Sequence, residues 1–251
     1  LPSGRGDRDG RHRSDLLAAE GRADRKLYLR KVWLIAMRDF YEEQLTRLHT
    51  QMIAMGSLCE KAISDATRAL TDGDLALAKE VMAGDSKINQ QERDIEAMCI
   101  KLLLHQQPVA GDLRRVSAAL KMVTDMERVG DQAADIAEIV VQMNEKLPDK
   151  FLHICKMATV AMKMVTDSVN AYVDMNLELA RKVIQSDDEV DELFLKVRGE
   201  ILDTIREDSN RGEELLDLFM ITKYYERIGD HATNIAEWVE YAITGERSEE
   251  N

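Results

Sequence analysis

Carboxylate or carboxamide side chains recur at every fourth residue in two separate stretches of the sequence. They are Glu127, Asp131 and Asp135 in the first stretch and Glu226, Asp230 and Asn234 in the second. In an α-helix, residues four apart differ by about 40° in direction, so each set forms a ladder along one helix face. Neighbouring carboxylates at this spacing repel by about 0.2–0.5 kcal/mol, and a bound divalent cation would turn that repulsion into attraction. The two ladders therefore predict two metal sites with oxygen ligands.

Further oxygen ligands lie upstream of each ladder. Asp85 and Asn89 are four residues apart and about 20 residues before Pro108, and the first ladder begins about as far after it. If Pro108 marks the turn of an antiparallel helical hairpin, Asp85 and Asn89 lie at the same level along the hairpin as the start of the first ladder. Asp187 and Asp191 are related to the second ladder in a similar way, although less evenly about the turn. Two facing helices that both supply oxygen ligands can build a multi-metal site in a bundle.

The ligand types restrict the metal. Carboxylate oxygens are hard ligands that suit Mg, Mn, Ca or Fe, and the pattern supplies little of the thiolate or imidazole that zinc prefers. The expected cofactors are divalent or iron-type metal ions, among which Fe, Mn, Mg and Zn stay open. The alternative is a solvated acidic face that holds no metal. Gly130 and Gly229 weigh against it, because Gly inside a helix costs about 1 kcal/mol relative to Ala and indicates the close approach of another helix.

The main enzymatic alternative is a di-iron carboxylate oxidase, which needs Glu-x-x-His on two helices. None of the 5 histidines has a glutamate three residues before it, so this motif is absent. His231 follows Asp230, but the first stretch has Gln132 at the matching position, and we expect His231 to be a surface variation. The sequence also has no HExxH motif, phosphate-binding loop or dinucleotide glycine motif. We predict a protein that is not an enzyme, with no catalytic residues and no organic cofactor.

Long helices are the elements that must position these ladders. Only 5% of the 251 residues are aromatic and only 3 are proline, which argues against β-sandwiches and barrels. From Met37 onward, apolar residues recur at three- and four-residue spacing, which is the period of an amphipathic helix. The pattern predicts six helices, at about 37–71, 75–107, 111–147, 154–175, 179–208 and 215–243. No apolar run approaches the roughly 18–20 residues that cross a bilayer.

The two ladders belong to an internal repeat. Residues 127–138 align with residues 226–237 at an offset of 99, and eight of the twelve positions are identical. Long helices joined by short connections form antiparallel bundles. We therefore predict an all-α fold of six long helices, which form two tandem pseudo-symmetric three-helix bundles at 37–147 and 151–246.

Residues 1–36 differ from the rest of the chain. They hold nine basic and five acidic residues, a net charge of +4, whereas residues 37–251 carry −17. The opening segment is low in sequence complexity, and we expect residues 1–36 to be a disordered extension or an overlong start outside the core. The acidic charge of the main body argues against a nucleic-acid partner.

Several motifs resemble one known family. In the first half they are Leu103-Leu-His-Gln-Gln-Pro-Val-Ala-Gly-Asp-Leu-Arg114, Ala118-Ala-Leu-Lys121 and Asp125-Met-Glu-Arg-Val-Gly-Asp131, and in the second half Tyr225-Glu-Arg-Ile-Gly-Asp-His-Ala-Thr-Asn-Ile235. These motifs resemble the PhoU family, whose members regulate the phosphate-specific transport system. The resemblance runs from about Met37 to Gly245 and covers both halves in order.

The resemblance implies two PhoU three-helix bundles and a non-enzymatic, cytoplasmic negative regulator of phosphate uptake and phosphate-starvation signalling. The implied partners are the ATPase subunit of the phosphate ABC transporter and the phosphate-sensing histidine kinase, and only through them would the protein associate with a membrane. Family members are commonly dimeric, which implies a homodimer. The family's acidic E/D-x-x-x-D motifs bind metal clusters, of iron in some members and of other divalent ions in others. They match Glu127-x-x-x-Asp131 and Glu226-x-x-x-Asp230 here.

The resemblance leaves part of the site and of the function open. Asp135 continues the first motif, whereas Asn234 replaces an acid in the second and is expected to weaken or reshape that site. The assignment of Asp85, Asn89, Asp187 and Asp191 rests on the hairpin argument above. One alternative function is a helical-bundle protein that handles or stores metal without a signalling partner. Another is a structural adaptor whose acidic faces hold no metal.

Overall fold

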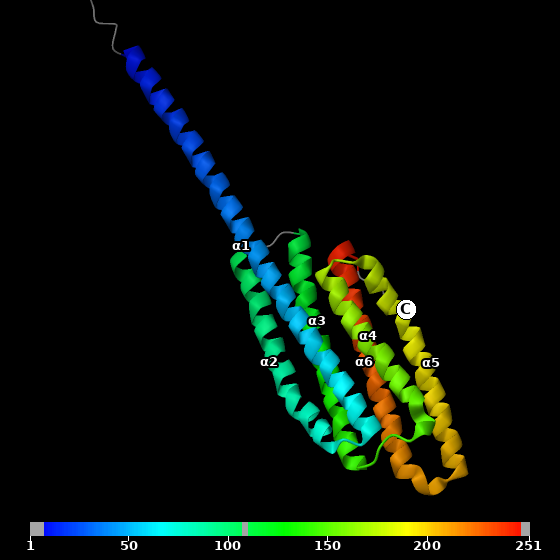
Figure 1. Ribbon diagram of the computed structural model, residues 1–251. Coiled ribbons are helices and arrows are strands. Elements are labelled where there is room, and N and C mark those ends of the chain that lie inside the picture. Colours follow the sequence, from blue (N-terminus) through cyan, green and yellow to red (C-terminus); the bar gives the residue numbers. More distant parts are fainter. Residues whose placement is uncertain (1–7, 107–109, 247–251) are drawn as a thin grey trace, which may run out of the picture. The chain divides into compact units, whose positions relative to one another are not determined.

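The computed structural model describes the backbone of residues 8–106 and 110–246 of the 251-residue chain, and side chains over 38–104 and 110–246. Within these residues, six α-helices and two short 3-10 turns are the only regular elements (Figure 1). The helices are α1 (Arg8–Asp72), α2 (Leu75–Gln106), α3 (Ala110–Met143), α4 (Leu152–Val173), α5 (Leu177–Glu207) and α6 (Gly212–Thr244). The 3-10 turns η1 (Asp149–Phe151) and η2 (Ser209–Arg211) precede α4 and α6. The predicted all-α fold of six long helices is confirmed.

The chain forms two compact units, residues 1–46 and residues 47–251, and α1 contributes to both. The backbone of the first unit is helical from Arg8, so the structure differs from the expected disordered extension, of which residues 1–7 lie outside the described residues. The sequence explains the helix, because no proline occurs between Pro2 and Pro108 and the segment is rich in the good helix formers Arg, Leu, Ala and Lys. That residues 1–36 are dispensable for the core stays a prediction.

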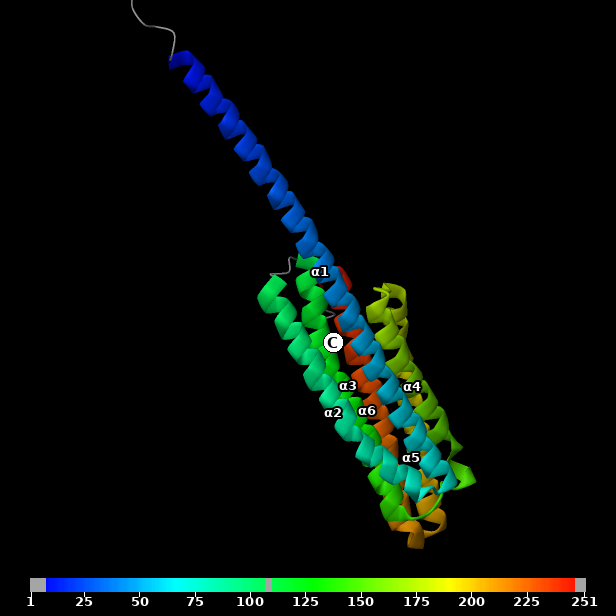
Figure 2. The same cartoon turned by 60° about the vertical axis from the view of Figure 1, so that its left-hand side comes forward.

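In the second unit, consecutive helices of each set of three run antiparallel (Figures 1 and 2). α3 packs on α2 and on α6, and α6 also packs on α4 and α5. The part of α1 that belongs to this unit is tied to α3 and α6. Cys59 Sγ donates to the backbone oxygen of Met126 over 3.2 Å, and Thr67 Oγ1 lies 2.8 Å from the hydroxyl of Tyr225. The two sets of three helices meet along α3 and α6.

Matching residues begin corresponding helices in the two halves. Oδ1 of Asp74 accepts hydrogen bonds of 3.0–3.1 Å from two backbone N–H groups in the first turn of α2. Asn176 lies 102 residues after Asp74, and its Oδ1 accepts a hydrogen bond of 3.0 Å from the backbone N–H of Leu179 in the first turn of α5. Such caps satisfy donors that a helix leaves unpaired at its start, and each is typically worth about 1 kcal/mol. At the other end, Gly245 terminates α6 with a φ of 81°, as predicted from the sequence.

Large apolar and aromatic side chains fill the core of the second unit. The largest fully buried ones include Leu48, Met52, Met55, Phe151, Tyr172 and Tyr225. The two tyrosines keep partners for their polar ends, because Tyr172 donates its hydroxyl to the backbone oxygen of Arg115 over 3.0 Å and Tyr225 meets Thr67. The apolar residues form stripes rather than continuous runs. No helix in the described part of the chain has an apolar stretch that is long and uncharged enough to cross a bilayer.

Candidate metal sites

Two mid-helix glycines set the distance between the helices that carry the acidic residues. A Cβ atom at Gly130 of α3 would lie 2.8 Å from Cδ1 of Ile88 on α2. At the matching place in the second half, a Cβ atom at Gly229 of α6 would lie 3.2 Å from Cγ1 of Val190 on α5. The close approach of a second helix, predicted from these glycines, is confirmed. Asp85 and Asp187 lie one turn before Ile88 and Val190, and Asp131 and Asp230 directly follow the two glycines. The close approach therefore brings Asp85 beside Asp131 and Asp187 beside Asp230.

The first acidic site joins Asp85 of α2 to Glu127 and Asp131 of α3. Burial and the nearby negative charge of Asp131 raise the pKa of Asp85. Burial raises the pKa of Glu127 as well, and the charges of Asp131 and Asp85 add to the increase. Ionised carboxylates at this site therefore destabilise one another across the α2–α3 boundary, which is the arrangement expected from the hairpin argument.

Asn89 lies beside Asp85 in this site. Nδ2 of Asn89 donates to Oδ2 of Asp85 over 2.8 Å, which leaves one oxygen of each side chain for other partners. Both of these oxygens, Oδ1 of Asp85 and Oδ1 of Asn89, are buried without a hydrogen-bond partner among the described residues. A buried acceptor without a donor is costly, and a hard cation is one group that would satisfy both. The oxygen donors at this site thus fit a divalent metal ion in chemical kind.

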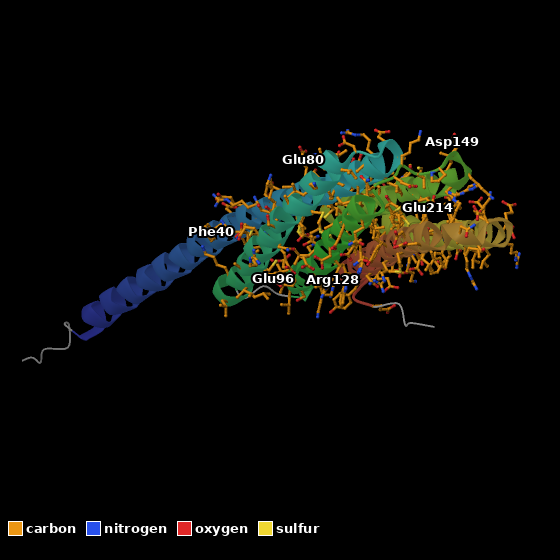
Figure 3. All side chains as sticks on the ribbon, turned by 90° about the horizontal axis from the view of Figure 1, so that it is seen from below. Phe40, Glu80, Glu96, Arg128, Asp149 and Glu214 are labelled. Atoms are coloured by element: carbon orange, nitrogen blue, oxygen red, sulfur yellow. The ribbon has the colours of Figure 1, made fainter. Side chains whose placement is uncertain are left out.

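Arg128 partly neutralises the first ladder. Its Nη1 lies 3.3 Å from Oδ2 of Asp131 and its Nε lies 3.8 Å from Oε2 of Glu127, although its side chain is 57% exposed. Figure 3 marks the position of Arg128 among the side chains. Ion pairs with an exposed arginine are weak, typically below about 1 kcal/mol. Arg128 lessens the repulsion within the ladder and leaves the buried oxygens of Asp85 and Asn89 unchanged.

The second acidic site contains four carboxylates from α5 and α6. Burial, followed by the charges of Asp230 and Asp191, raises the pKa of Asp187 to about 6. Burial and the charges of Glu226 and Asp191 raise the pKa of Asp230. Lys223 forms an ion pair with Glu226 in this site. The structure therefore brings Asp187 and Asp191 to Glu226 and Asp230, as predicted from the repeat.

The last residues of the two ladders lie toward the boundary between α3 and α6. Burial, followed by the charge of Asp131, raises the pKa of Asp135. Burial also raises the pKa of Tyr224 on α6, and the charge of Asp135 adds to that increase. Asn234 donates from Nδ2 to Oδ1 of Asp125 on α3 over 3.4 Å. The hydrogen bond of Asn234 is therefore directed across this boundary and not to the carboxylates of α5.

His231 is not the surface variation that the sequence comparison predicts. Its Nδ1 lies 3.0 Å from Oδ1 of Asp125, and the two side chains are only 22% and 17% exposed. Asp125 thus accepts hydrogen bonds from two residues of the other half. Sequence reasoning missed this pair because the matching positions of the repeat hold Tyr224 and Gln132, which give no sign of a His–Asp contact.

The carboxylates are close enough to perturb one another, but their oxygens do not converge on one point. Over residues 38–104 and 110–246, no group of three or more His, Cys, Asp or Glu side chains is arranged so that it could hold a metal ion. Whether metal binds at Glu127, Asp131, Asp135, Glu226, Asp230, Asn234, Asp85, Asn89, Asp187 and Asp191 stays a prediction.

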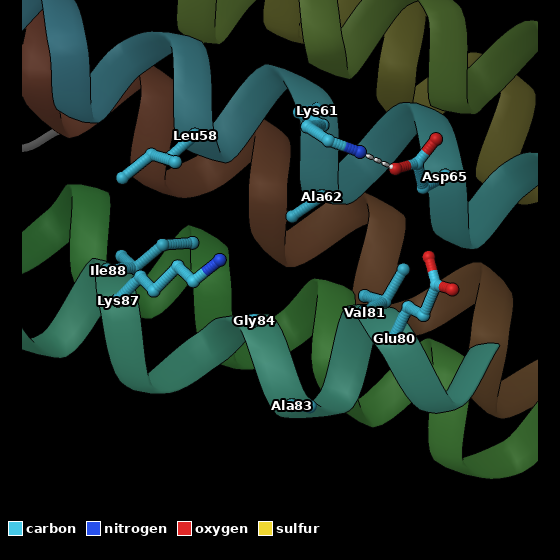
Figure 4. Close-up of a pocket in the computed structure, with 10 residues that line it drawn as sticks. All are labelled: Leu58, Lys61, Ala62, Asp65, Glu80, Val81, Ala83, Gly84, Lys87 and Ile88. Atoms are coloured by element: carbon cyan, nitrogen blue, oxygen red, sulfur yellow. Dashed lines mark hydrogen bonds and ion pairs between the residues drawn. The ribbon is translucent and has the colours of Figure 1, made fainter. Parts of the chain in front are cut away.

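A groove of about 420 Å³ lies between α1 and α2 (Figure 4). Small residues, Ala62 of α1 and Gly84 of α2, contribute to its lining, and the Lys61–Asp65 ion pair lies along it. At an offset of 102, Ala62 matches Met164 of α4, whose side chain is only 2% exposed. The groove follows from small side chains of the first half and is not a requirement of the shared three-helix arrangement.

The sequence pattern that defines the PhoU domain matches this chain twice, over residues 52–140 and 154–239. The chain belongs to the PhoU family. The two matched segments contain all ten predicted site residues of the PhoU acidic faces. They also correspond to the two sets of three helices, one match to each.

Named relatives and solved structures agree with this assignment. The phosphate-specific transport system accessory protein PhoU homolog of Clostridium acetobutylicum is 38% identical over 216 residues, which are 85% of this chain and 99% of that protein. The homolog of the same name from Pseudomonas aeruginosa is 35% identical over 82% of this chain and 86% of its own. Crystal structures of PhoU from P. aeruginosa and of the phosphate transport system regulatory protein PhoU from Streptococcus pneumoniae have TM-scores of 0.78 and 0.77. The P. aeruginosa structure is 34% identical in sequence, and the match covers 82% of this chain and 100% of that one. The S. pneumoniae structure is 28% identical, and the match covers 83% of this chain and 99% of that one.

Proposed function

We propose that this protein is a non-enzymatic accessory protein that regulates phosphate uptake by a phosphate-specific transport system. The observation that carries the proposal is the match to a relative of that name over 99% of the relative's length. Both halves of the chain match the PhoU domain, so the proposal does not depend on one half alone.

The mode of action that we propose is negative regulation by protein contact. The protein would bind the ATPase subunit of the phosphate ABC transporter and the phosphate-sensing histidine kinase. It would act in the cytoplasm as a homodimer, and it would meet the membrane only through these partners. Family resemblance supports this part of the proposal, and the charged helical surface offers many polar groups for such contacts.

We also propose that each acidic site holds divalent metal. In the first site the ligands would be Asp85, Asn89, Glu127 and Asp131, and in the second Asp187, Asp191, Glu226 and Asp230. A bound cation would supply positive charge between two helices of each half. The buried acceptors of Asp85 and Asn89 and the raised pKa values of Asp85, Asp187 and Asp230 support this assignment. Ionised carboxylates that destabilise one another are the groups that a cation stabilises most.

A reporter of phosphate starvation tests the regulatory function in cells. A strain without its own PhoU protein should express the reporter even in high phosphate, and this protein should restore repression. The ATPase subunit should copurify with the tagged protein from the same cells. If the reporter stays derepressed while the protein is folded and present, the proposed regulation is wrong. Saturable metal uptake without any copurifying transporter subunit would instead favour the metal-handling alternative.

A further inference from the structure

The groove between α1 and α2 is large and apolar enough to receive side chains of another molecule. Its volume of about 420 Å³ lies within the range of roughly 300–1,000 Å³ that is usual for ligand-binding clefts. Val81 and Ile88 of α2 line it with side chains that are only 7% and 2% exposed, and Ala62 and Gly84 contribute little side-chain volume (Figure 4). Covering such walls with apolar groups removes them from water, which favours binding.

The second half of the chain shows what the matching place accepts. Three small residues of the groove each correspond to a larger residue at an offset of 102. The pairs are Ala62 and Met164, Ala83 and Gln185, and Gly84 and Ser186. Met164 is only 2% exposed, so its unbranched side chain is packed inside the second half. The three-helix arrangement therefore accepts a long apolar side chain at this place, and the residues at the matching positions of the first half do not supply one.

Two residues of opposite charge stand at the ends of the groove. Glu80 and Lys87 are seven residues apart on α2, which is about two turns and about 10 Å along one side of the helix. Figure 4 shows the carboxylate of Glu80 at one end and the ammonium of Lys87 at the other, with Ala62 and Gly84 between them. Within the described part of the chain, neither charged group has an ion-pair or hydrogen-bond partner. Both charges can therefore pair with charges of another molecule.

This arrangement of end charges is a feature of the first half alone. The matching residues of α5 are Lys182 and Glu189, so both signs are reversed. Glu189 is also paired with Lys156 of α4 over 3.0 Å, whereas the residue that matches Lys156 beside Lys87 is Ala54. A molecule whose charges complement the ends of the groove would meet like charges at the corresponding place of the second half. The charges thus select a molecule for the first half.

A second copy of α2 would not fill the groove. Antiparallel pairing of α2 with α2 of another copy would place Glu80 opposite Lys87, so their charges would be complementary. The residues halfway between them are Ala83 and Gly84, however, and these add almost no side chain to a groove of about 420 Å³. The groove requires a large apolar side chain at this point, and it therefore fits a helix of another protein better.

We propose that the groove between α1 and α2 binds a helix of a partner protein, which inserts a large unbranched apolar side chain over Ala62 and Gly84. The partner helix carries an acidic residue that meets Lys87 and a basic residue that meets Glu80. Positions four before and three after the inserted side chain are seven residues apart and share one side of a helix, as Glu80 and Lys87 do. Binding of an amphipathic helix in a groove is a common mode of recognition. The inference rests on the proposed function for the existence of a partner and adds the place of contact.

A peptide titration with the full chain tests this inference. Three fluorescent 18-residue helical peptides share one apolar side centred on a methionine, the residue that stands at the matching place of the second half. They differ only at the positions four before and three after this methionine. The dipolar peptide has one glutamate and one lysine there, the acidic peptide two glutamates and the basic peptide two lysines. Because a helix can lie in the groove in either direction, the order of glutamate and lysine does not matter.

Filling the groove should prevent binding. Ala62→Met introduces the side chain of the second half and should weaken binding of the dipolar peptide about tenfold. Ala97→Met adds the same side chain at an exposed position of α2 that does not line the groove, and it should leave binding unchanged. Urea unfolding shows whether both variants are folded. Equal binding by the wild type and Ala62→Met would overturn the inference, and so would a wild type that binds no peptide with a Kd below about 1 mM.

Reversing one end charge at a time should change which peptide binds most tightly. The wild type should bind the dipolar peptide about threefold more tightly than the other two, because ion pairs between exposed groups are weak. Lys87→Glu makes both ends acidic and should favour the basic peptide, whereas Glu80→Lys should favour the acidic peptide. Lys182→Glu and Glu189→Lys make the same changes of charge in the second half and should keep the wild-type order. If these controls change the order equally, net charge selects the peptide and the inference is wrong.

Two further measurements separate this inference from a dimer interface and from the proposed function. If sedimentation shows a wild-type dimer that Ala62→Met converts to a monomer, the groove joins two copies and the inference is wrong. The titration contains no transporter component. Normal peptide binding together with a failure to repress the phosphate-starvation reporter would therefore count against the proposed function alone. Normal repression by a protein that fails the peptide tests would count against this inference alone.

Discussion

His231 of α6 donates a hydrogen bond from Nδ1 to Oδ1 of Asp125 on α3 over 3.0 Å, and Asn234 Nδ2 reaches the same oxygen at 3.4 Å. This group crosses the line along which the two sets of three helices meet. Asp125 is thus the shared acceptor for two donors of the other half. The two halves are joined here by directional bonds in addition to apolar packing.

Asp125→Ala is therefore expected to lower the free energy of unfolding by about 1–3 kcal/mol, because it leaves two partly buried donors without their acceptor. His231→Gln should cost less, since a glutamine amide can still donate and Gln132 stands at the matching position of the first half. Urea unfolding midpoints measure both effects. Asp203→Ala serves as the control, because Asp203 is 66% exposed in an ion pair with Arg206. Equal losses for Asp125→Ala and Asp203→Ala would contradict a role of Asp125 in joining the halves.

The helices and the pairing of α2 with α3 could be predicted because they depend on local signals. Gly245 marks the end of α6, and a hairpin about Pro108, which itself lies outside the described residues, is enough to bring Asp85 to Asp131. The contact of Asp125 with His231 could not be predicted in the same way. It depends on the rotation and height of α3 against α6, and helical periodicity fixes neither of these.

The direction of Asn234 shows the same limit of sequence reasoning. Spacing places it on the ladder of Glu226 and Asp230, and the expected consequence of its amide was a weakened metal site. The structure gives the amide a donor role toward Asp125 across the α3–α6 boundary. A ladder drawn on one helix predicts which residues share a face, whereas the choice of partner depends on the two neighbouring helices that border that face.

Gly130→Ala is expected to destabilise the protein although alanine is the better helix former. A Cβ atom there would lie 2.8 Å from Cδ1 and 3.0 Å from Cγ2 of Ile88, so α2 and α3 must move apart or Ile88 must change its rotamer. Overpacking of this kind costs about 1–3 kcal/mol, which exceeds the roughly 1 kcal/mol gained in helix propensity. Adding Ile88→Val, which copies Val190 of the second half, should recover part of the loss. Urea midpoints of the single and double variants measure the coupling.

Gly199→Ala is the control for this prediction. Gly199 lies inside α5, and an added Cβ atom would have no described neighbour within 4 Å. This substitution should raise the free energy of unfolding by about 0.5–1 kcal/mol through helix propensity and reduced freedom of the unfolded chain. If Gly130→Ala also raised it, the close approach of Ile88 to Gly130 would not restrict this position.

The raised pKa of Asp187 predicts a stability that depends on pH. Its ordinary value is 3.8, and burial with the charges of Asp230 and Asp191 raises it to about 6. The folded state therefore binds this proton more tightly than the unfolded state does. The contribution of Asp187 to stability is greatest below about pH 4, decreases as the pH rises toward about 6, and stays low above that.

Asp187→Asn removes the ionisation and should stabilise the protein at pH 7.5, while leaving its stability nearly unchanged at pH 4. Because Asp187 is partly exposed, solvent screening reduces the expected gain to the order of 1 kcal/mol. Asp188→Asn makes the same change of charge at an exposed neighbouring position and is the control. Urea unfolding midpoints at both pH values measure the effect. If Asp187→Asn stabilised the protein equally at pH 4 and pH 7.5, ionisation of Asp187 would not be the cause of the stabilisation.

Filling the groove between α1 and α2 should stabilise the first half. Ala62→Met introduces the residue that stands at the matching position of α4, where Met164 is almost fully buried. Partial burial of the added apolar atoms is worth about 1 kcal/mol, which would raise the urea midpoint. The reverse change, Met164→Ala, should create a cavity and cost about 2–5 kcal/mol. A decrease in stability on Ala62→Met would mean that the walls of the groove cannot accommodate the longer side chain.

Metal binding at the acidic sites would convert mutual repulsion into attraction, and its effect on stability is therefore measurable without knowledge of a partner. A ligand that binds only the folded state stabilises it by RT ln(1 + [L]/Kd), which is about 2.7 kcal/mol at a hundredfold excess over Kd. Mn²⁺ or Fe²⁺ should accordingly raise the melting temperature of the wild type.

The double variant Asp131→Asn with Asp230→Asn should lose most of this increase, because one ligand is changed in each half. Without metal, the same variant should be slightly more stable than the wild type, since the charges of Asp131 and Asp230 raise the pKa values of neighbouring carboxylates and each substitution removes one of these charges. These two expectations have opposite signs, so a variant that is merely misfolded cannot satisfy both. Asp203→Asn with Asp188→Asn removes the same number of charges at other surface positions and should respond to metal like the wild type. If metal raises the melting temperature of all three proteins equally, the acidic faces are not the binding sites, and the solvated-face interpretation of the ladders is the better one.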